Sequence, residues 1–432
     1  SSKKDTIWEK VKAKKKFEAS PIVKSGFRLL MSLRSVTFSY GQSNNTTLPG
    51  FNPKPGNFGQ DWGLNAPGLD FIFGSQDPDF RYRAARNGWI SNDLRIASQF
   101  SQGKTTNFNI RAILEPVPDM RVEITMKRDF NITRSANFKF DTTGNFNDFR
   151  DLAAIESGTY SMTFNIFNTA FKDPNATFKE FVGSRYSIAK RLQNSNSFYS
   201  AGTDPKGFPK GYSGGQQEVL LYSFLSAYSG KSADRQKLQL FPSLPDMNWR
   251  ITYNGLSKME LLKEYTSNVS ISHSYSSVYS IPKYTTSVNY FPGLDSSGLI
   301  QPKYIVSSVV ITERFAPLLG VDVTFLNSLT TSFSYNTDRS LNLAITNSQI
   351  TESRNKEYTL GIGYRPRKLT IPFISARGRQ TVLRNDINMR MDFSIRDNKT
   401  IVRKIDQSAE NQPVNGNKVI TIRPTIDYMI NE

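Results

Sequence analysis

Residues 303–347 read KYIVSSVVITERFAPLLGVDVTFLNSLTTSFSYNTDRSLNLAITN. Two long runs within this stretch meet at Asn327-Ser328. In the second run the odd positions are mostly apolar, and the even positions are small or polar. Alternation with a period of two is typical of β-strands. The stretch therefore predicts a hairpin of two long strands.

The length of this alternation is informative as well. A strand of a soluble protein has about 5–6 residues, and each arm here keeps its phase for much longer. A strand tilted by about 45° needs about 9–11 residues to cross a bilayer, and the strands of transmembrane barrels are apolar outward and polar inward. We therefore predict an all-β fold, an antiparallel transmembrane β-barrel segment with helical insertions in its loops.

The same alternation assigns side chains to the two faces of the predicted barrel wall. The predicted lipid-facing side chains are Val321, Val323, Phe325, Phe333, Tyr335, Leu341, Leu343 and Ile345. The predicted lumen-facing side chains are Ser332, Ser334, Asn342, Arg390 and Arg396, the last two from a second alternating run at 387–396.

The composition agrees with a strand-rich membrane protein. Of the 432 residues, 38% are hydrophobic, and the mean hydropathy is −0.46. We find no apolar run long enough for a spanning helix, but barrel strands alternate and average out to polar. The sequence has 30 Phe, 19 Tyr and no Cys. It therefore favours strands and excludes disulfides and thiolate metal sites.

The charge balance is strongly basic, with a formal net charge of +18. Such an excess is compatible with nucleic acid, anionic lipid or acidic cargo. The basic residues are dispersed along the chain, and the one clear cluster comprises Lys3, Lys4 and the lysines between Lys10 and Lys16. We therefore expect outer-membrane lipid as a partner and no nucleic acid.

The chain divides into four parts. Residues 1–25 are a basic tail or linker, and 26–167 carry barrel strands around a long aromatic and glycine-rich loop at 41–104. Residues 168–246 form a helix-containing loop insertion, and 247–432 return to barrel strands. The chain starts without a signal-peptide pattern and stops on a strand-like sequence, so we expect a segment truncated at its C-terminal end.

Within these parts the apolar spacing predicts a few helices. The insertion contains one helix around 178–192 and a second at 218–228, and shorter helices are predicted at 256–265 and at 148–156. We count about a dozen strands. The short turns at 115–119 and 327–328 fall on opposite ends of the sheet by this count, so the sequence assigns no sidedness.

The sequence offers little for chemistry. His273 is the one histidine, and its neighbours Ser272 and Ser274 point to the opposite face of a strand, so a Ser/His pair is disfavoured. Gly361-Ile362-Gly363 lacks the rest of a dinucleotide fingerprint. We expect no catalytic residue, no metal and no cofactor, and thus not an enzyme.

Three segments carry a resemblance to one family. They are LPDMNWRITYNGLSK at 244–258, ITERFAPLLGVD at 311–322 and NAPGLDFIFG at 65–74. These segments resemble the C-terminal part of the SprA (Sov) family, the giant outer-membrane translocons of the type 9 secretion system of Bacteroidota.

The resemblance implies a localisation, a function and partners. It implies a very large single-chain barrel in the cell outer membrane, which passes folded cargo proteins to the cell surface and supports gliding motility. The implied partners are the rest of the same large polypeptide, a PorV-type shuttle barrel, a periplasmic plug protein and cargo with a C-terminal signal.

Two other readings remain open from the residues alone. One is a stand-alone outer-membrane porin or uptake channel of about a dozen strands. The other is a secreted β-rich adhesin. The sequence does not identify the cargo or the gating mechanism.

Overall fold

The structure is a computed structural model that describes residues 31–93, 95, 98–143, 148–196, 202–288, 290–291, 293–366, 369–376, 379–383, 387–405 and 412–428. The basic tail predicted over 1–25 lies outside these residues.

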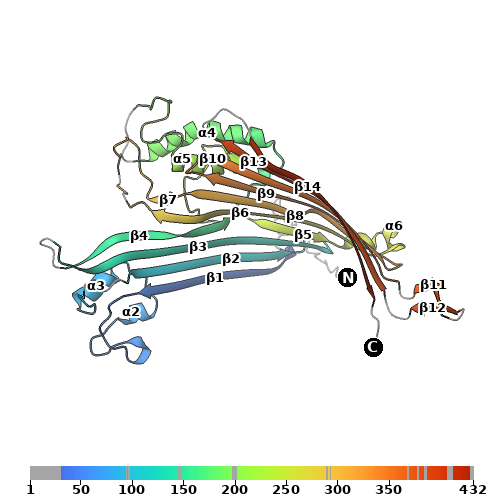
Figure 1. The fold of residues 1–432 in the computed structure, drawn as a ribbon, viewed down its shortest axis with the longest axis horizontal. Helices are drawn as coiled ribbons and strands as arrows, with labels where there is room; N and C mark the ends of the chain where they lie inside the picture. The colour runs from blue at the N-terminus through green and yellow to red at the C-terminus, as the bar shows by residue number, and fades with distance from the viewer. Residues whose placement is uncertain are drawn as a thin grey trace, which may run out of the picture.

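One large antiparallel sheet dominates the fold (Figure 1). Its twelve strands are β1 (Leu33–Thr47), β2 (Phe100–Leu114), β3 (Met120–Asp141), β4 (Asp148–Thr163), β5 (Asn248–Tyr253), β6 (Thr266–Thr286), β7 (Tyr304–Val306), β8 (Ser308–Phe325), β9 (Leu329–Ala344), β10 (Gln349–Tyr364), β13 (Ile387–Lys404) and β14 (Gln412–Tyr428). A separate hairpin comprises β11 (Leu369–Ala376) and β12 (Arg379–Leu383). The predicted all-β antiparallel architecture is thereby confirmed.

The twelve strands occupy ten side-by-side positions in the sheet, here called lanes. Their order is β1-β2-β3-β4-β6-β8-β9-β10-β13-β14. β5 pairs with the same two neighbours as β4 and continues its lane, and β7 precedes β8 in the next. Among the described strands, β1 pairs only with β2 and β14 only with β13. The described sheet therefore has two open edges.

Eight helical segments connect the strands. They are η1 (Asn57–Gly59), α2 (Leu69–Ile72), α3 (Phe80–Arg86), η2 (Phe167–Thr169), α4 (Pro174–Ser195), α5 (Gln217–Ser229), η3 (Gly255–Lys258) and α6 (Glu260–Lys263) in the described residues. No helix among the described residues is both long enough and apolar enough to span a bilayer.

The two predicted helices of the insertion are confirmed as α4 and α5. α4 begins where the Asp173 carboxylate accepts a hydrogen bond from the Ala176 N–H, with Pro174 in the first turn. α5 ends at Gly230, whose φ of 71° is the left-handed conformation that glycine adopts without strain. The helical turn predicted at 256–265 corresponds to η3 and α6.

The helix predicted at 148–156 is wrong, because these residues begin β4. They pair with the far end of the 22-residue β3, where Asp148 lies opposite Asp141 and Phe149 opposite Phe140. Phe149 also stacks on Phe138 at 5.6 Å. A long neighbouring strand with free backbone groups and aromatic partners outweighs the local helical spacing.

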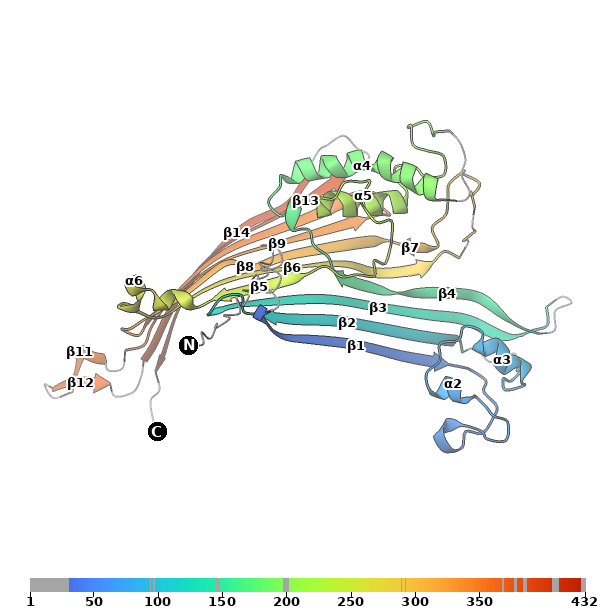
Figure 2. The ribbon, with the colours of Figure 1, turned by 180° about the vertical axis from the view of Figure 1, so that it is seen from behind.

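The loop predicted at 41–104 is shorter than expected, because β1 runs to Thr47 and β2 begins at Phe100. The connecting segment carries α2 and α3 and has its own small core, in which Phe80, Trp89 and Phe138 are buried. It is ordered against one end of the sheet (Figure 2).

The placement of the two short turns on opposite ends of the sheet is also wrong. Leu114, at the end of β2, lies opposite Val122 and Leu33, and the row continues through β5 and β6 toward the β8–β9 turn. The turns at 115–119 and 326–328 therefore share one end. The count along the sequence missed this because β4 and β5 form one lane.

The segment 164–247 leaves and re-enters the sheet in the middle of that lane. The Asp246 N–H donates to the Thr163 carbonyl at 2.9 Å, so the two ends of the insertion are adjacent. Between them, α4 and α5 form a layer over one face of the sheet (Figure 2). Hereafter this layer is called the helical cover.

Candidate functional site

One face of the sheet, here called the polar face, is hydrophilic across the lanes. The cross-strand pairs place one residue from each of eight strands in a row, which comprises Arg121, Thr252, Ser272, Gly320, Ser334, Thr359, Ser394 and Thr421. The predicted lumen-facing Ser332, Ser334, Asn342, Arg390 and Arg396 all lie on this face.

Several charges on the polar face are paired with one another. The Arg396 guanidinium lies 2.7 Å from a Glu357 carboxylate oxygen, and Arg390 lies 2.8 Å from Asp392. Both arginines are largely exposed, so each pair stabilises the fold by at most about 1 kcal/mol. Their main effect is to leave this face nearly neutral locally.

The polar face is hollowed between β6 and β14. A groove of about 690 Å³ runs over the middle of these strands. Its lining is almost entirely hydroxyl, amide and charged side chains, among them Thr312, Ser340, Asn355, Asn398 and Asn417. Such a lining offers hydrogen-bond donors and acceptors along its length.

The opposite face carries an apolar band, which lies over the half of the sheet next to the short turns. One row of this band also crosses eight strands and comprises Met120, Tyr253, Ile271, Val321, Phe333, Leu360, Phe393 and Ile422. Neighbouring rows on β1 contain Val36, Phe38 and Tyr40, each more than half exposed. An exposed apolar surface of this extent marks an interaction with lipid or protein.

The apolar band has a limited height along the strands. On β14 it runs from Ile420 to Tyr428, about 27 Å at about 3.4 Å per residue. A tilt of about 40° reduces this to about 20 Å, close to the apolar belt of about 25 Å on outer-membrane barrels. Tyr335 and Tyr358 stack at the border of the band that lies next to the helical cover, with ring centroids 4.4 Å apart. Aromatic side chains at a border are typical of a membrane interface.

The predicted lipid-facing side chains divide between two environments. Val321, Val323, Phe325, Phe333 and Tyr335 lie on the open apolar band.

The prediction is wrong for Leu341 and Leu343, which are fully buried, and Ile345 is partly buried against the same core. The helical cover packs on them through residues such as Phe181 and Phe224, so protein and not lipid contacts this half of β9.

Two ion pairs are buried beneath the helical cover. Arg339 lies 2.9 Å from Glu313, and Arg403 lies 2.6 Å from Glu352, all four side chains being at most 5% exposed. Arg339 also donates to the Thr169 carbonyl at 3.0 Å. These charges therefore tie the start of the insertion to the sheet.

Sequence reasoning missed these ion pairs. Glu313 and Arg339 interrupt two otherwise apolar faces at positions that the hairpin register places opposite each other. Two opposite charges facing each other on an apolar face could have indicated a second protein layer, because an unpaired charge there is unfavourable in either lipid or a protein core.

His273 has a structural partner. Its Nδ1 lies 2.7 Å from the Leu318 carbonyl oxygen, so the tautomer with a proton on Nδ1 donates there. This carbonyl belongs to a register shift between Phe315 and Leu319. His273 thus satisfies a backbone group where the ladder is interrupted.

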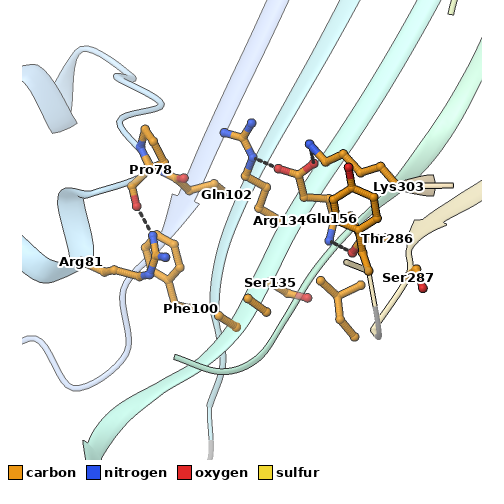
Figure 3. A pocket seen from close by; sticks show the side chains of 14 residues that line it. Pro78, Arg81, Phe100, Gln102, Arg134, Ser135, Glu156, Thr286, Ser287 and Lys303 are labelled. Carbon is orange, nitrogen blue, oxygen red and sulfur yellow. Dashed lines mark hydrogen bonds and ion pairs between the residues drawn. The ribbon is translucent and has the colours of Figure 1, made fainter. Parts of the chain in front are cut away.

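A separate cavity of about 360 Å³ lies at the far end of β2–β4, next to α3 (Figure 3). In Figure 3, Arg134 and Lys303 point toward Glu156, at 2.6 and 3.9 Å. Arg81 of α3 donates to Asp151 at 2.8 Å. Each carboxylate here has a cationic partner, so the contacts fasten two loops to the sheet.

Comparison with protein-family models and with curated protein sequences finds no match to this chain.

Proposed function

We propose that this chain forms a section of the wall of a protein-conducting channel in the outer membrane, the translocon of the type 9 secretion system. In this proposal the apolar band contacts lipid, and the polar face lines the passage. The wall belongs to a much larger transmembrane barrel formed with the rest of the same polypeptide.

One observation carries the proposal: an apolar band and a polar face lie back to back on the same lanes, each in an unbroken row across eight strands. A soluble sheet with one wet face buries its other face against protein. Here the helical cover occupies only the half of that face that lies away from the short turns. Lipid is the partner that suits the uncovered half.

The proposed mechanism is passive conduction. Hydroxyl and amide side chains on the polar face exchange hydrogen bonds with the water around a folded cargo. Arg390 and Arg396 are neutralised by neighbouring carboxylates, which weakens their attraction for an acidic cargo. A cargo with a C-terminal signal would be handed to a PorV-type shuttle barrel, and a periplasmic plug protein would close the passage. We propose a contribution to gliding motility on the same basis.

A stand-alone porin is the second candidate, because ten lanes lie within the range of about 8–26 strands found in closed outer-membrane barrels. It requires β1 to pair with β14. Cysteines introduced into the middle of β1 and of β14 would then form a disulfide, and this cross-link would favour the porin. Its absence is expected for a section of a larger wall.

The absence of cysteine from the sequence makes the main test direct. Single cysteines along 329–343 are introduced into the protein in its membrane and probed with a water-soluble maleimide and a lipid-phase spin quencher. We expect Cys at 332, 334 and 342 to react with the maleimide, at 333 and 335 to sense the quencher, and at 341 and 343 to do neither. Equal aqueous reactivity at 332–335 would exclude the proposal.

A further inference from the structure

The upper border of the apolar band, between the sheet and the first turn of α4, contains two adjoining crevices. One of about 160 Å³ is lined by Phe171, Phe315 and Tyr335 together with Arg354 and Lys356. The other, of about 240 Å³, shares Arg354 and Lys356 and adds Pro174 and Lys399. Together they make a continuous cleft around two cationic side chains.

The unpaired cations of this cleft exceed its unpaired carboxylates. Of the acidic residues that line it, Glu313, Asp338 and Glu352 each pair with an arginine, which leaves Lys356 and Lys399 with Asp397. Arg354 and Arg403 share the carboxylate of Glu352, at 2.5 and 2.6 Å. Lys356 and Lys399 are exposed, and neither forms an ion pair with any residue in the described part of the chain. Arg390 and Arg396 on the polar face, by contrast, pair with carboxylates.

The next strand extends this excess. Lys418 lies on the same face, opposite Asp397, and Asp397 also lies opposite Lys356. One acidic side chain therefore stands between two lysines.

An exposed apolar lane begins directly below the cleft. The stacked rings of Tyr335 and Tyr358 form its upper border, and Leu360, Ile362 and Tyr364 follow down β10, each between 37% and 44% exposed. A lipid with its phosphate in the cleft would thus have its acyl chains beside this lane. A free anion would contact the lysines but not the apolar lane.

We infer that the cleft around Lys356 and Lys399 binds the headgroup of a phosphate-bearing membrane lipid, with its acyl chains on the apolar lane of β10. The inference rests on the proposed membrane location of the apolar band. Lysines near an anionic membrane surface are attracted to it, and two lysines in one cleft with Arg354 suit a single phosphate group. An acidic protein segment would match the charges but leave the apolar lane uncovered.

The test uses the complete protein purified in detergent and native mass spectrometry with three probes. They are dioleoyl phosphatidic acid, dioleoylglycerol with the same chains but no phosphate, and inorganic phosphate. We expect the protein to bind phosphatidic acid and not dioleoylglycerol, and inorganic phosphate at the lipid concentration not to displace the lipid. Displacement by inorganic phosphate would overturn the inference in favour of an anion site.

The variant Lys356→Gln/Lys399→Gln should bind phosphatidic acid about tenfold or more weakly. Lys356→Arg/Lys399→Arg should retain binding, which separates charge from folding. The matched control Arg121→Gln/Lys127→Gln removes the same charge from the polar face and should change nothing. Equal binding by the cleft and control variants would overturn the inference.

Flotation of the protein with vesicles separates this inference from the proposed function. If the protein floats with vesicles but binds no phosphatidic acid, only the proposed lipid site is wrong. If the protein does not associate with vesicles, both the proposed membrane location and the lipid site are wrong.

Discussion

The apolar face of the sheet has two halves with the same alternating sequence pattern. One half is open, and the other is covered by helices. On β9, Phe333 belongs to the open band, whereas Leu343, ten residues later on the same face, is fully buried. The difference comes from α4 and α5, which lie more than a hundred residues earlier in the chain. Alternation thus specifies a face, and a distant segment decides what covers it.

The buried charges should separate the two halves most strongly. Arg339→Met leaves the Glu313 carboxylate buried without its partner, which costs about 3–5 kcal/mol of unfolding free energy, whereas the double variant Glu313→Met/Arg339→Met should be nearly neutral. Denaturant unfolding in detergent, with proteolysis of the helical cover as a second readout, measures both. A single variant as stable as the double one would show that the pair does not hold the cover.

Apolar truncation should distinguish the halves next. Leu343→Ala opens a cavity beneath the helical cover and should lower the unfolding free energy by about 2–5 kcal/mol. Leu360→Ala, on the open band, removes the same atoms where lipid or detergent can refill the space and should cost much less. Equal losses in the same unfolding assay would mean that the band is packed against protein.

Charge insertion should report on the face. Phe333→Arg places a guanidinium in the band and should reduce the stability of the folded protein in lipid vesicles by about 2–4 kcal/mol. Ser334→Arg, one residue later, lies on the polar face and should be tolerated. The contrast should disappear in aqueous detergent-free solution if the protein is a soluble adhesin.

The paired arginines of the polar face should affect transport more than stability. Arg390→Gln/Arg396→Gln breaks exposed pairs worth at most about 1 kcal/mol each, so insertion into the membrane should be normal. Secretion of cargo should change, because Asp392 and Glu357 then leave unpaired negative charge on the wall. Unaltered secretion at normal protein levels would argue against a conducting role for this face.

The smallest effect is expected at Glu218 in α5. Burial raises the pKa of this carboxyl, so the folded state favours its protonated form. The stability that it contributes is complete below the unfolded pKa of about 4.3 and is lost as the pH rises through the raised folded value. Glu218→Gln should therefore be more stable than the wild type at neutral pH and equal to it in acid, as pH-dependent unfolding would show.

The strands and their two faces could be predicted from the sequence because the period of two is local information. The polar assignment of Ser332, Ser334 and Arg396 depends only on which neighbours alternate, and the structure places all three on one face. The helices α4 and α5 could likewise be predicted from local information, because their apolar residues recur with a period near 3.6.

What could not be predicted depends on tertiary contacts. The burial of Leu341 and Leu343 requires knowing where the insertion folds back, and the strand at 148–156 forms because β3 extends far enough to pair with it. The position of the short turns required knowing that β4 and β5 share a lane. The cleft at Lys356 and Lys399 depends on where α4 begins.

Because Thr163 and Asp246 are adjacent, the segment that carries the helical cover could be removed as one unit. A short linker in place of 164–247 would let β4 run directly into β5 and restore one uninterrupted strand. Excision would expose two ion pairs and a leucine-rich patch on the apolar face of the sheet. A duplication or loss of this segment during evolution would therefore change what contacts that face without altering the strands of the sheet.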